Sequence, residues 1–277
     1  RRNAIPVYVI GLPAPWGQTN PNAKNPKAVE EAKDDLTPTY GPESFLSERV
    51  DLDNWTAHYA VRTNTSAVDS GFGPFAMERL CRASRGQFFA LRPGLGYGFR
   101  GVSAKAWPSG EELRFEEKIV GKYAPDYVSE AEYRKLLAEN KARAALCEAA
   151  KLAKVTIEGS PGTRFAKDAK AKNAEATMAK QMSAAQQFAA RNLPEIDRIY
   201  NVLAPSEADR AKLTSPRWQA EFDLAFGRVL ANKVRLDGYN SMIAALKRGK
   251  NFEKPNSTEW VLEAADSFET EIGRAHV

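Results

Sequence analysis

Residues 4–12, AIPVYVIGL, form a nearly unbroken run of β-branched, aliphatic and aromatic side chains that ends at a Pro-Ala-Pro sequence. Such a run predicts a strand that is buried on both faces of a parallel sheet. A second apolar run, GQFFAL at residues 86–91, predicts another strand. We expect residues 5–11 and 87–91 to be neighbouring parallel strands.

The segment between the two strands ends in a helix signal. GPFAMERLCRASRG, residues 73–86, has Pro74 at the first helical turn and Gly86 after the last one. A helix over 75–84 places its apolar side chains mostly on one side, namely those of Phe75, Met77, Leu80 and Cys81. Strand, helix and strand make a βαβ unit, whose right-handed crossover puts both strands in one sheet.

Residues 13–73 are an insertion of about sixty residues without clear periodicity, a length that is typical of functional loops. The insertion is rich in Pro, Asn, Asp and Thr. Segments that leave the carboxyl ends of parallel strands lie on the ligand-binding side of the sheet. We therefore expect a specificity lid in its middle and ligand-facing residues at its two ends: Trp16, Asp69, Ser70, Gly71, Phe72 and Gly73. The two glycines would let the backbone approach a ligand closely.

The rest of the chain is predicted to be a linker, a helical domain and a tail. The glycines of RPGLGYGFRG fit no complete phosphate-binding loop, and residues 101–128 are interpreted as a flexible linker after a first domain of residues 1–100. Residues 129–250 form the helical domain, and 251–271 an extended tail.

Four helices are expected in the helical domain, packed as antiparallel hairpins. One begins at the capping box Ser129/Glu132 and runs on through KLAK, and a second spans about Thr163–Arg191. A third starts at Pro194 and a fourth at Pro216, ending near Gly249. The fourth carries an apolar stripe that we expect in the core: Trp218, Phe222, Ala225, Val229, Leu236 and Ile243.

Composition indicates a globular protein and argues against a nucleic-acid-binding protein and a disulfide-rich one. The 277 residues are 43% hydrophobic and 27% charged, with a formal net charge of +5. The lysine-rich runs alternate with Ala and acidic residues and lack aromatic side chains, so solvated helix faces are favoured over a nucleic-acid site. Cys81 and Cys147 are expected to be buried free thiols. The compartment and any membrane association stay open.

Two stretches, IPVYVIGLPAPWG and VDSGFGPFAMERLCRASRGQFFAL, resemble the last third of a von Willebrand factor type A (vWA) domain. Residues 7–11, 77–85 and 86–90 take the places of its closing strand, helix and final strand, with Arg85-Gly86 where a Gly-Gly pair is usual. The resemblance to large bacterial vWA-domain proteins continues through two later segments of the sequence, PDYVSEAEYRKLLAENKARAAL and LTSPRWQAEFDLAFGRVLANKVRLDGYNSM. The resemblance implies an α/β class followed by α: a partial Rossmann-like vWA fold and then a mostly helical domain.

The metal site of the vWA family has no counterpart in this sequence. The family uses a D-x-S-x-S loop, a later Thr and a later Asp, all upstream of the part that is similar here. A divalent cation needs several oxygen ligands from separate loops. We therefore expect no metal or other cofactor in this chain, although Mg²⁺ or a similar cation is possible in a longer protein. Asp69 and Ser70 are interpreted as the entry to the helix.

Both ends of the chain suggest a piece of a longer protein. An apolar strand begins four residues from the N-terminus without an initiator Met. The final EIGRAHV can be encoded by a common sequencing adapter, so residues 272–277 are expected to be a sequencing artefact.

The sequence favours a non-enzymatic protein-binding or scaffolding protein with a protein partner. One alternative is a serine hydrolase that uses Ser70 with His58 as base, although a G-x-S-x-G elbow is missing. The other is a tetratricopeptide-like helical adaptor, for which only one repeat unit is visible and no period near 34 residues recurs.

Overall fold

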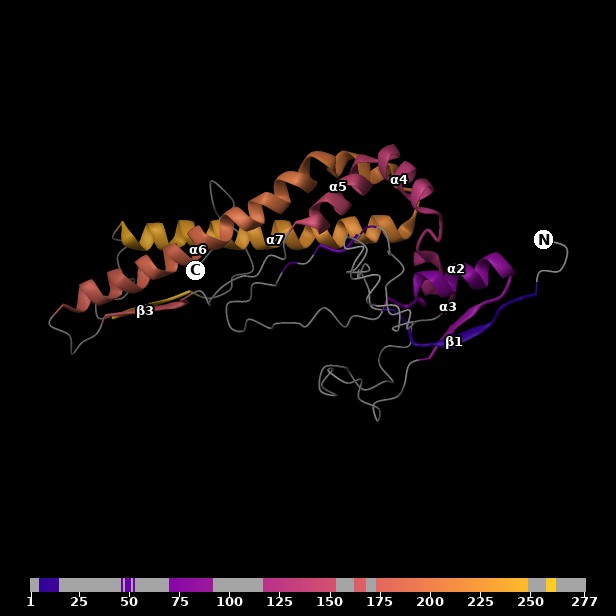
Figure 1. Ribbon diagram of the computed structural model, residues 1–277. Coiled ribbons are helices and arrows are strands. Elements are labelled where there is room, and N and C mark those ends of the chain that lie inside the picture. The colour runs from indigo at the N-terminus through magenta and orange to yellow at the C-terminus, as the bar shows by residue number, and fades with distance from the viewer. Residues whose placement is uncertain are drawn as a thin grey trace, which may run out of the picture. The chain divides into compact units, whose positions relative to one another are not determined.

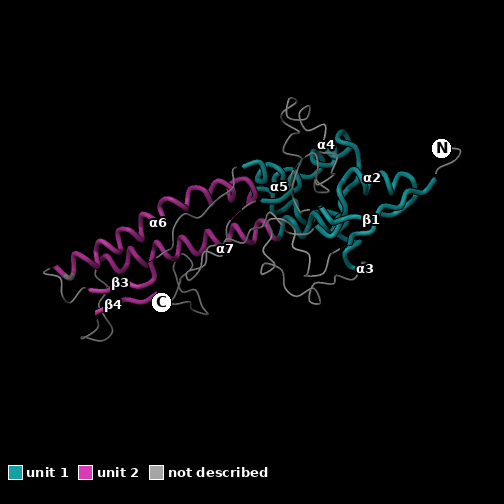
Figure 2. Tube along the Cα trace, turned by 60° about the horizontal axis from the view of Figure 1, so that its bottom comes forward, with its two compact units in different colours: residues 1–50, 64–152, 205–223 teal, residues 51–63, 153–204, 224–277 magenta. Residues whose placement is uncertain are grey.

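The structure is a computed structural model (Figure 1), which describes residues 5–14, 46, 48–50, 52, 70–91, 117–152, 162–167, 173–248 and 258–262. The chain divides into two compact units that are each discontinuous in sequence (Figure 2). Unit 1 comprises residues 1–50, 64–152 and 205–223, and unit 2 comprises 51–63, 153–204 and 224–277. The predicted domain boundaries at residues 100, 128 and 250 stay predictions.

Unit 1 contains a two-stranded parallel sheet. Strand β1 (Val9–Gly11) pairs with β2 (Phe88–Ala90), and Ile10 lies opposite Phe89. Helix α2 (Phe75–Ser84) connects the strands. The predicted parallel pairing and the predicted helix are therefore confirmed. The chain is α/β here and mostly helical afterwards, whereas the Rossmann-like vWA fold stays a prediction.

Only one face of this sheet is covered in the described part of the chain. Cys81 of α2 is fully buried and Phe88 is almost so, while the Ser84 hydroxyl accepts a 3.0 Å hydrogen bond from the Val7 amide. On the opposite face Ile10 is 68% exposed. The expectation that the first strand is buried on both faces is therefore wrong, because α2 covers one side and no other described element covers the second.

After β2, the described part of unit 1 continues with α3 (Glu117–Val120) and the 3₁₀ turn η5 (Gly121–Tyr123). Two longer helices follow, α4 (Glu130–Glu139) and α5 (Lys141–Lys151). The Ser129 hydroxyl accepts a hydrogen bond from the Glu132 amide, which confirms the predicted start.

The single long helix predicted from residue 129 is wrong, because Asn140 interrupts it. Asn140 has an extended backbone, with φ −140° and ψ 121°, and its side-chain oxygen accepts a 3.0 Å hydrogen bond from the Arg143 amide. An Asn side chain that caps a new helix competes with continuation of the old one. Asn140 therefore ends α4 and begins α5.

Unit 2 contains a short antiparallel sheet and most of two long helices. Strand β3 (Arg164–Ala166) pairs with β4 (Glu259–Val261), and Phe165 of β3 is buried. The predicted helix start near Thr163 is wrong, because these residues form β3 and helix α6 spans Ala174–Leu203.

Helix α6 also continues through Pro194, so the separate helix predicted there is wrong. Proline removes one backbone hydrogen bond and clashes with the preceding turn. Here the buried stripe continues past it with Ile196, Ile199 and Leu203, each at most 1% exposed. Packing of an amphipathic face supplies most of the stability of a helix, so it outweighs the local break signal.

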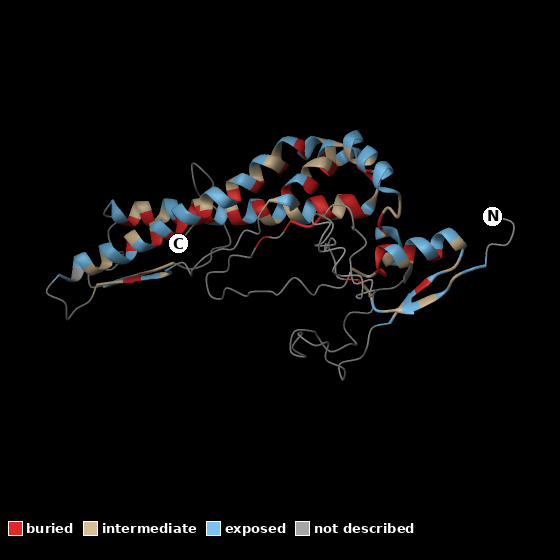
Figure 3. Ribbon diagram, in the orientation of Figure 1, coloured by how far each residue is buried: buried red, intermediate tan, exposed pale blue. Residues whose placement is uncertain are grey.

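The turn η6 (Ala204–Lys212) follows, and α7 (Pro216–Lys247) confirms the predicted fourth helix. Five residues of its predicted stripe, Trp218, Phe222, Val229, Leu236 and Ile243, are at most 1% exposed, whereas Ala225 is only partly buried. Figure 3 shows the buried positions of the helices in red. In unit 2, α6 and α7 run antiparallel, as predicted, because Phe188 contacts Tyr239 whereas the later Tyr200 contacts the earlier Phe226. The units meet in sequence within α7, between residues 223 and 224.

Candidate functional site

The predicted ligand-facing residues are described in part. The structure brings Ser70, Gly71, Phe72 and Gly73 together in one turn beside Ala14, just beyond the carboxyl end of β1. The Ala14 amide donates to the Phe72 carbonyl at 2.8 Å, and the Ser70 amide donates to the Ala14 carbonyl at 3.0 Å. The two ends of the insertion therefore meet, as the positional argument predicts. Trp16, Asp69 and His58 lie outside the described residues.

The polar groups of this turn bind each other. The Ser70 hydroxyl accepts from the Phe72 amide at 3.2 Å and donates to the Phe72 carbonyl at 3.0 Å. The Gly73 amide donates to the carboxylate of Glu78, at 3.1 Å, which closes the start of α2. These contacts describe a turn at the entry to the helix. They also occupy the hydroxyl that the hydrolase alternative would need.

The two glycines of the turn have structural reasons of their own. Gly71 has a φ of 81°, a left-handed conformation that side chains disfavour. A Cβ at Gly73 would lie 2.5 Å from the ring of Phe88. The backbone at Gly73 therefore approaches the Phe88 side chain of β2 closely. Phe72, which lies between the two glycines in sequence, is buried.

The uncovered side of the sheet is an apolar surface that we call the bare face. Its residues alternate with the covered ones along both strands, and Tyr8 stacks on Phe89 with 6.4 Å between the ring centroids. The exposed fractions run from 43% for Leu12 to 68% for Ile10. The bare face consists of Tyr8, Ile10, Leu12, Phe89 and Leu91.

The helical part of unit 1 encloses a group of acidic and basic side chains, the charged cluster. It comprises Glu48, Asp126, Arg143 and Arg217. Glu48 is 2% exposed, and its carboxylate accepts from Arg217 Nε at 3.1 Å and from the Tyr133 hydroxyl at 3.2 Å. Residues 48–50 belong to the insertion, so this described part of it is core and not lid.

The second ion pair of the charged cluster is held by an aromatic side chain. Arg143 binds Asp126 through Nη2 and lies over the ring of Trp218, 3.7 Å from its centroid. Trp218 Nε1 donates to the same carboxylate at 2.9 Å. Three elements, namely the segment after η5, α5 and α7, are thereby joined at one carboxylate.

Burial shifts the protonation of this region. Burial, with the charge of Glu221 second, raises the pKa of Glu48 well above its ordinary value. Burial lowers the pKa of Arg217 to about 10 and raises that of Cys147 to about 12, while the pKa of Tyr133 also rises because of its burial. The Cys147 thiol therefore stays neutral and is a poor nucleophile.

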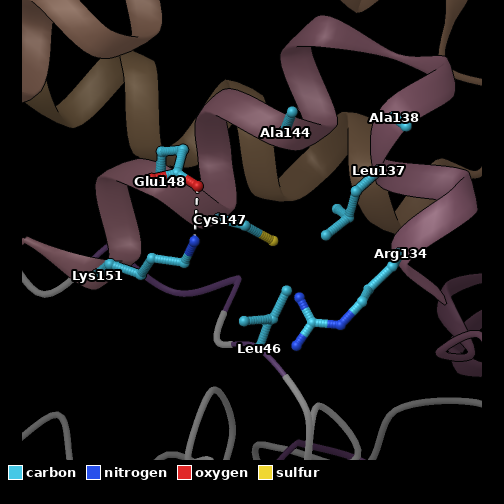
Figure 4. Close-up of a pocket in the computed structure, with 8 residues that line it drawn as sticks. All are labelled: Leu46, Arg134, Leu137, Ala138, Ala144, Cys147, Glu148 and Lys151. Atoms are coloured by element: carbon cyan, nitrogen blue, oxygen red, sulfur yellow. Dashed lines mark hydrogen bonds and ion pairs between the residues drawn. The ribbon is translucent and has the colours of Figure 1, made fainter. Parts of the chain in front are cut away.

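A pocket of about 260 Å³ lies between α4 and α5 (Figure 4). Apolar side chains line much of it, and the Cys147 sulfur points into it. The cations at its rim are already paired, Lys151 with Glu148 at 2.6 Å and Arg134 with Glu130 at 2.7 Å. The apolar part of the lining is Leu46, Leu137, Ala138, Ala144 and Cys147. This chemistry suits an apolar side chain better than a charged ligand.

Among the described residues, no group of three or more His, Cys, Asp or Glu side chains is arranged to hold a metal ion. No helix in the same part of the chain is both long and apolar enough to cross a membrane. The two described cysteines are free and buried, as predicted.

Sequence reasoning missed the charged cluster and the bare face. The partners Glu48 and Arg217 are far apart in sequence, and Glu48 lies in a polar stretch that resembles any loop. The exposure of Ile10 and Phe89 depends on which elements cover the sheet, which a strand pattern does not encode.

Comparison with protein-family models, with curated proteins and with solved structures gave no match.

Proposed function

We propose that this chain is a non-enzymatic protein-binding module, in which the bare face of the β1/β2 sheet binds an amphipathic helix of a partner protein. The exposed, contiguous apolar surface around Ile10 and Phe89 is the observation that carries the proposal. The vWA resemblance is part of the same proposal, because the partial vWA fold that it implies contains a parallel sheet like the one on which the surface lies.

The chemistry of the surface favours a helix as the occupant. Parallel sheets are normally covered by helices on both faces, and here α2 covers only one. Stacked Tyr8 and Phe89, next to aliphatic Ile10, offer a broad apolar patch without charges. Aromatic and aliphatic anchors of this kind dominate the binding energy of protein interfaces.

The test uses a phage-displayed library of amphipathic helical peptides selected on the chain. Ile10→Lys and Phe89→Lys place a charge on the bare face and should abolish binding of the selected peptides, because a charge that is buried without a partner costs several kcal/mol. Both side chains are substantially exposed, at 68% and 44%, so the fold should persist and circular dichroism should be unchanged.

Ile119→Lys is the matched control, since Ile119 is 51% exposed on α3 and lies outside the bare face. It should leave peptide binding intact. Selected peptides that bind Ile10→Lys and Phe89→Lys as well as the natural chain would contradict the proposal.

A further inference from the structure

Helix α2 carries exposed positive charge that no exposed acidic residue of its own βαβ unit balances. Arg79 and Arg82 lie three residues apart in the helix, and Arg85 is its C-cap residue. All three are exposed. Within the described residues of the βαβ unit the acidic side chain is that of Glu78, which is buried. We call the three arginines the arginine edge.

Two guanidinium groups of the arginine edge are held in place by aromatic rings. Arg79 lies over Phe75, 5.9 Å from the ring centroid, and Arg82 lies over Tyr127 at 4.5 Å. Arg82 Nε also contacts the Glu78 carboxylate at 3.5 Å, yet the Arg82 side chain remains 50% exposed. A guanidinium that is already positioned loses less conformational entropy when it binds an anion. These arginines are therefore prepared for binding.

Arg85 stands at a position that a glycine would fill with less strain. Its φ of 66° is left-handed, and helices commonly end on Gly or Asn in this conformation. The next residue, Gly86, has a packing reason, since a Cβ there would lie 1.8 Å from the Val7 carbonyl oxygen. Arg85 is exposed and has no such reason. A strained residue that the packing does not require points to a role for its side chain.

Acidic residues of the described chain do not neutralise the arginine edge. Arg79 and Arg85 form no ion pair with a described acidic side chain. Asp126, which precedes Tyr127 in sequence, is bound by Arg143 and by Trp218 instead. The arginine edge therefore remains available to carboxylates from outside the chain.

The exposed side of α2 continues beside the arginines with apolar residues. Ala76, Leu80 and Ala83 follow each other at steps of four and three, which keeps them in line, and Leu80 is 50% exposed. The two alanines allow the backbone of another helix to approach. The charge of the arginine edge then decides which kind of helix fits, namely one that carries carboxylates beside its apolar residues.

We propose that α2 binds an acidic amphipathic helix of a partner protein, whose apolar residues pack on Leu80 and whose carboxylates pair with the arginine edge. A planar guanidinium binds a carboxylate through two parallel hydrogen bonds, which requires defined positions on both sides. Arginines that are fixed by rings match the fixed carboxylates of a folded helix.

The same surface fits a membrane or a nucleic acid less well. Insertion into a lipid surface requires a larger apolar face than the single exposed leucine of this ten-residue helix. Single-stranded nucleic acids stack their bases on aromatic side chains, whereas the rings of Phe75 and Tyr127 already contact the guanidinium groups.

This inference does not depend on the proposed function, because α2 covers the sheet face opposite to the bare face. Ile10→Lys should therefore leave binding to α2 unchanged. Loss of one binding activity with retention of the other distinguishes failure of this inference from failure of the proposed function.

The test measures binding of a labelled helical peptide to the whole chain by fluorescence anisotropy. The peptide has about four turns, with Glu along one edge and Leu along the neighbouring edge, and the matched peptide has Gln in place of Glu. At about 0.15 M salt the Glu peptide should bind and the Gln peptide should bind at least tenfold more weakly. Arg79→Gln should raise the dissociation constant of the Glu peptide about fivefold. Arg191→Gln is the matched control, because it removes the same charge from an exposed position of α6.

Arg85→Gly separates a role in binding from a role in the fold. Glycine adopts the left-handed conformation without strain, so the midpoint of urea denaturation should stay the same or rise. The dissociation constant of the Glu peptide should nevertheless rise about threefold or more. If Arg85 only ended the helix, this variant would bind the peptide as well as the natural chain does.

Three outcomes would overturn the proposal. One is that the Glu peptide shows no saturable binding at concentrations up to about 1 mM. Another is that Arg191→Gln weakens binding as much as Arg79→Gln does, since net charge and not α2 would then be responsible. The third is that phosphatidylserine vesicles or a single-stranded oligonucleotide bind more tightly than the Glu peptide and depend on the same arginines.

Discussion

Unit 1 buries acidic and basic side chains, whereas unit 2 buries almost only apolar ones among the described residues. Six charged residues are buried in the described part of the chain, and all of them belong to unit 1: Glu48, Arg49, Glu78, Arg143, Arg217 and Glu221. The buried polar residues described in unit 2 are Asn192 and Asn232. Its ion pairs, such as Lys233 with Asp197, lie where solvent reaches them.

The two cores differ because unit 2 is built mainly from two long helices, whereas unit 1 holds several short elements together. In unit 2 two long helices supply continuous apolar stripes, so a core forms from neighbouring turns of α6 and α7. In unit 1 short elements and an isolated segment around Glu48 meet, and specific pairs such as Glu48 with Arg217 fix their arrangement. Removing one member of a buried pair is much more costly than removing both. Charge-specific sensitivity should therefore be confined to unit 1.

The largest expected effect is that of Arg217→Met. The substitution keeps the aliphatic stem but leaves the Glu48 carboxylate buried without its 3.1 Å partner, and it should lower the free energy of unfolding by about 3–5 kcal/mol. Urea denaturation followed by circular dichroism measures this change. The double variant Glu48→Gln/Arg217→Met should recover much of the loss, because the uncompensated charge is gone. Equal losses in the single and double variants would show that packing and not charge is responsible.

Local patterns predicted the elements that local interactions determine. The βαβ unit follows from apolar runs and from Pro74, and α7 begins at Pro216 as expected because its stripe is long and uninterrupted. The errors occur where a distant or competing contact decides. The Asn140 side chain ends a helix that the apolar periodicity would continue. Helix α6 continues past Pro194 because residues beyond it, such as Ile199, are buried in the core.

The candidate site was predicted less well for the same reason. The position of Ser70 beside Ala14 follows from sheet topology, and topology can be inferred from the order of the elements. The pairing of Glu48 with Arg217 spans most of the chain and leaves no periodic signal. The bare face could not be predicted, because its exposure depends on which elements pack against each face of the sheet.

The next effect is a pH dependence of the Arg217→Met variant. Burial raises the pKa of Glu48 above its ordinary value of 4.5, so the folded state binds this proton more tightly than the unfolded state. Stability therefore falls as pH rises above that value, up to the pKa of the folded state, by at most about 1.4 kcal/mol per pH unit. Urea denaturation of Arg217→Met between about pH 5 and pH 8 should show this slope. The double variant with Glu48→Gln lacks the titrating group and serves as the control; a slope that persists in it would assign the effect to another residue.

The smallest effect is expected for Lys233→Met in unit 2. Lys233 Nζ lies 2.6 Å from Asp197 and 3.4 Å from Asp237, and the hydrogen bond to Asp197 raises the pKa of the lysine. Its side chain is 26% exposed and that of Asp197 is 36% exposed, so water screens the pair. Exposed pairs contribute about 0–1 kcal/mol, and we expect a loss within that range.

This ion pair should also respond to salt and to high pH in a defined direction. A raised lysine pKa contributes stability that is complete below the unfolded value near 10.5 and is lost as pH rises through the folded value. The difference between Lys233→Met and the natural chain should shrink in about 1 M NaCl, where the screening length is about 3 Å. If Lys233→Met destabilised the chain as much as Arg217→Met does, and did so independently of salt, unit 2 would depend on charge as strongly as unit 1. The contrast between an ion-paired core and an apolar one would then be wrong.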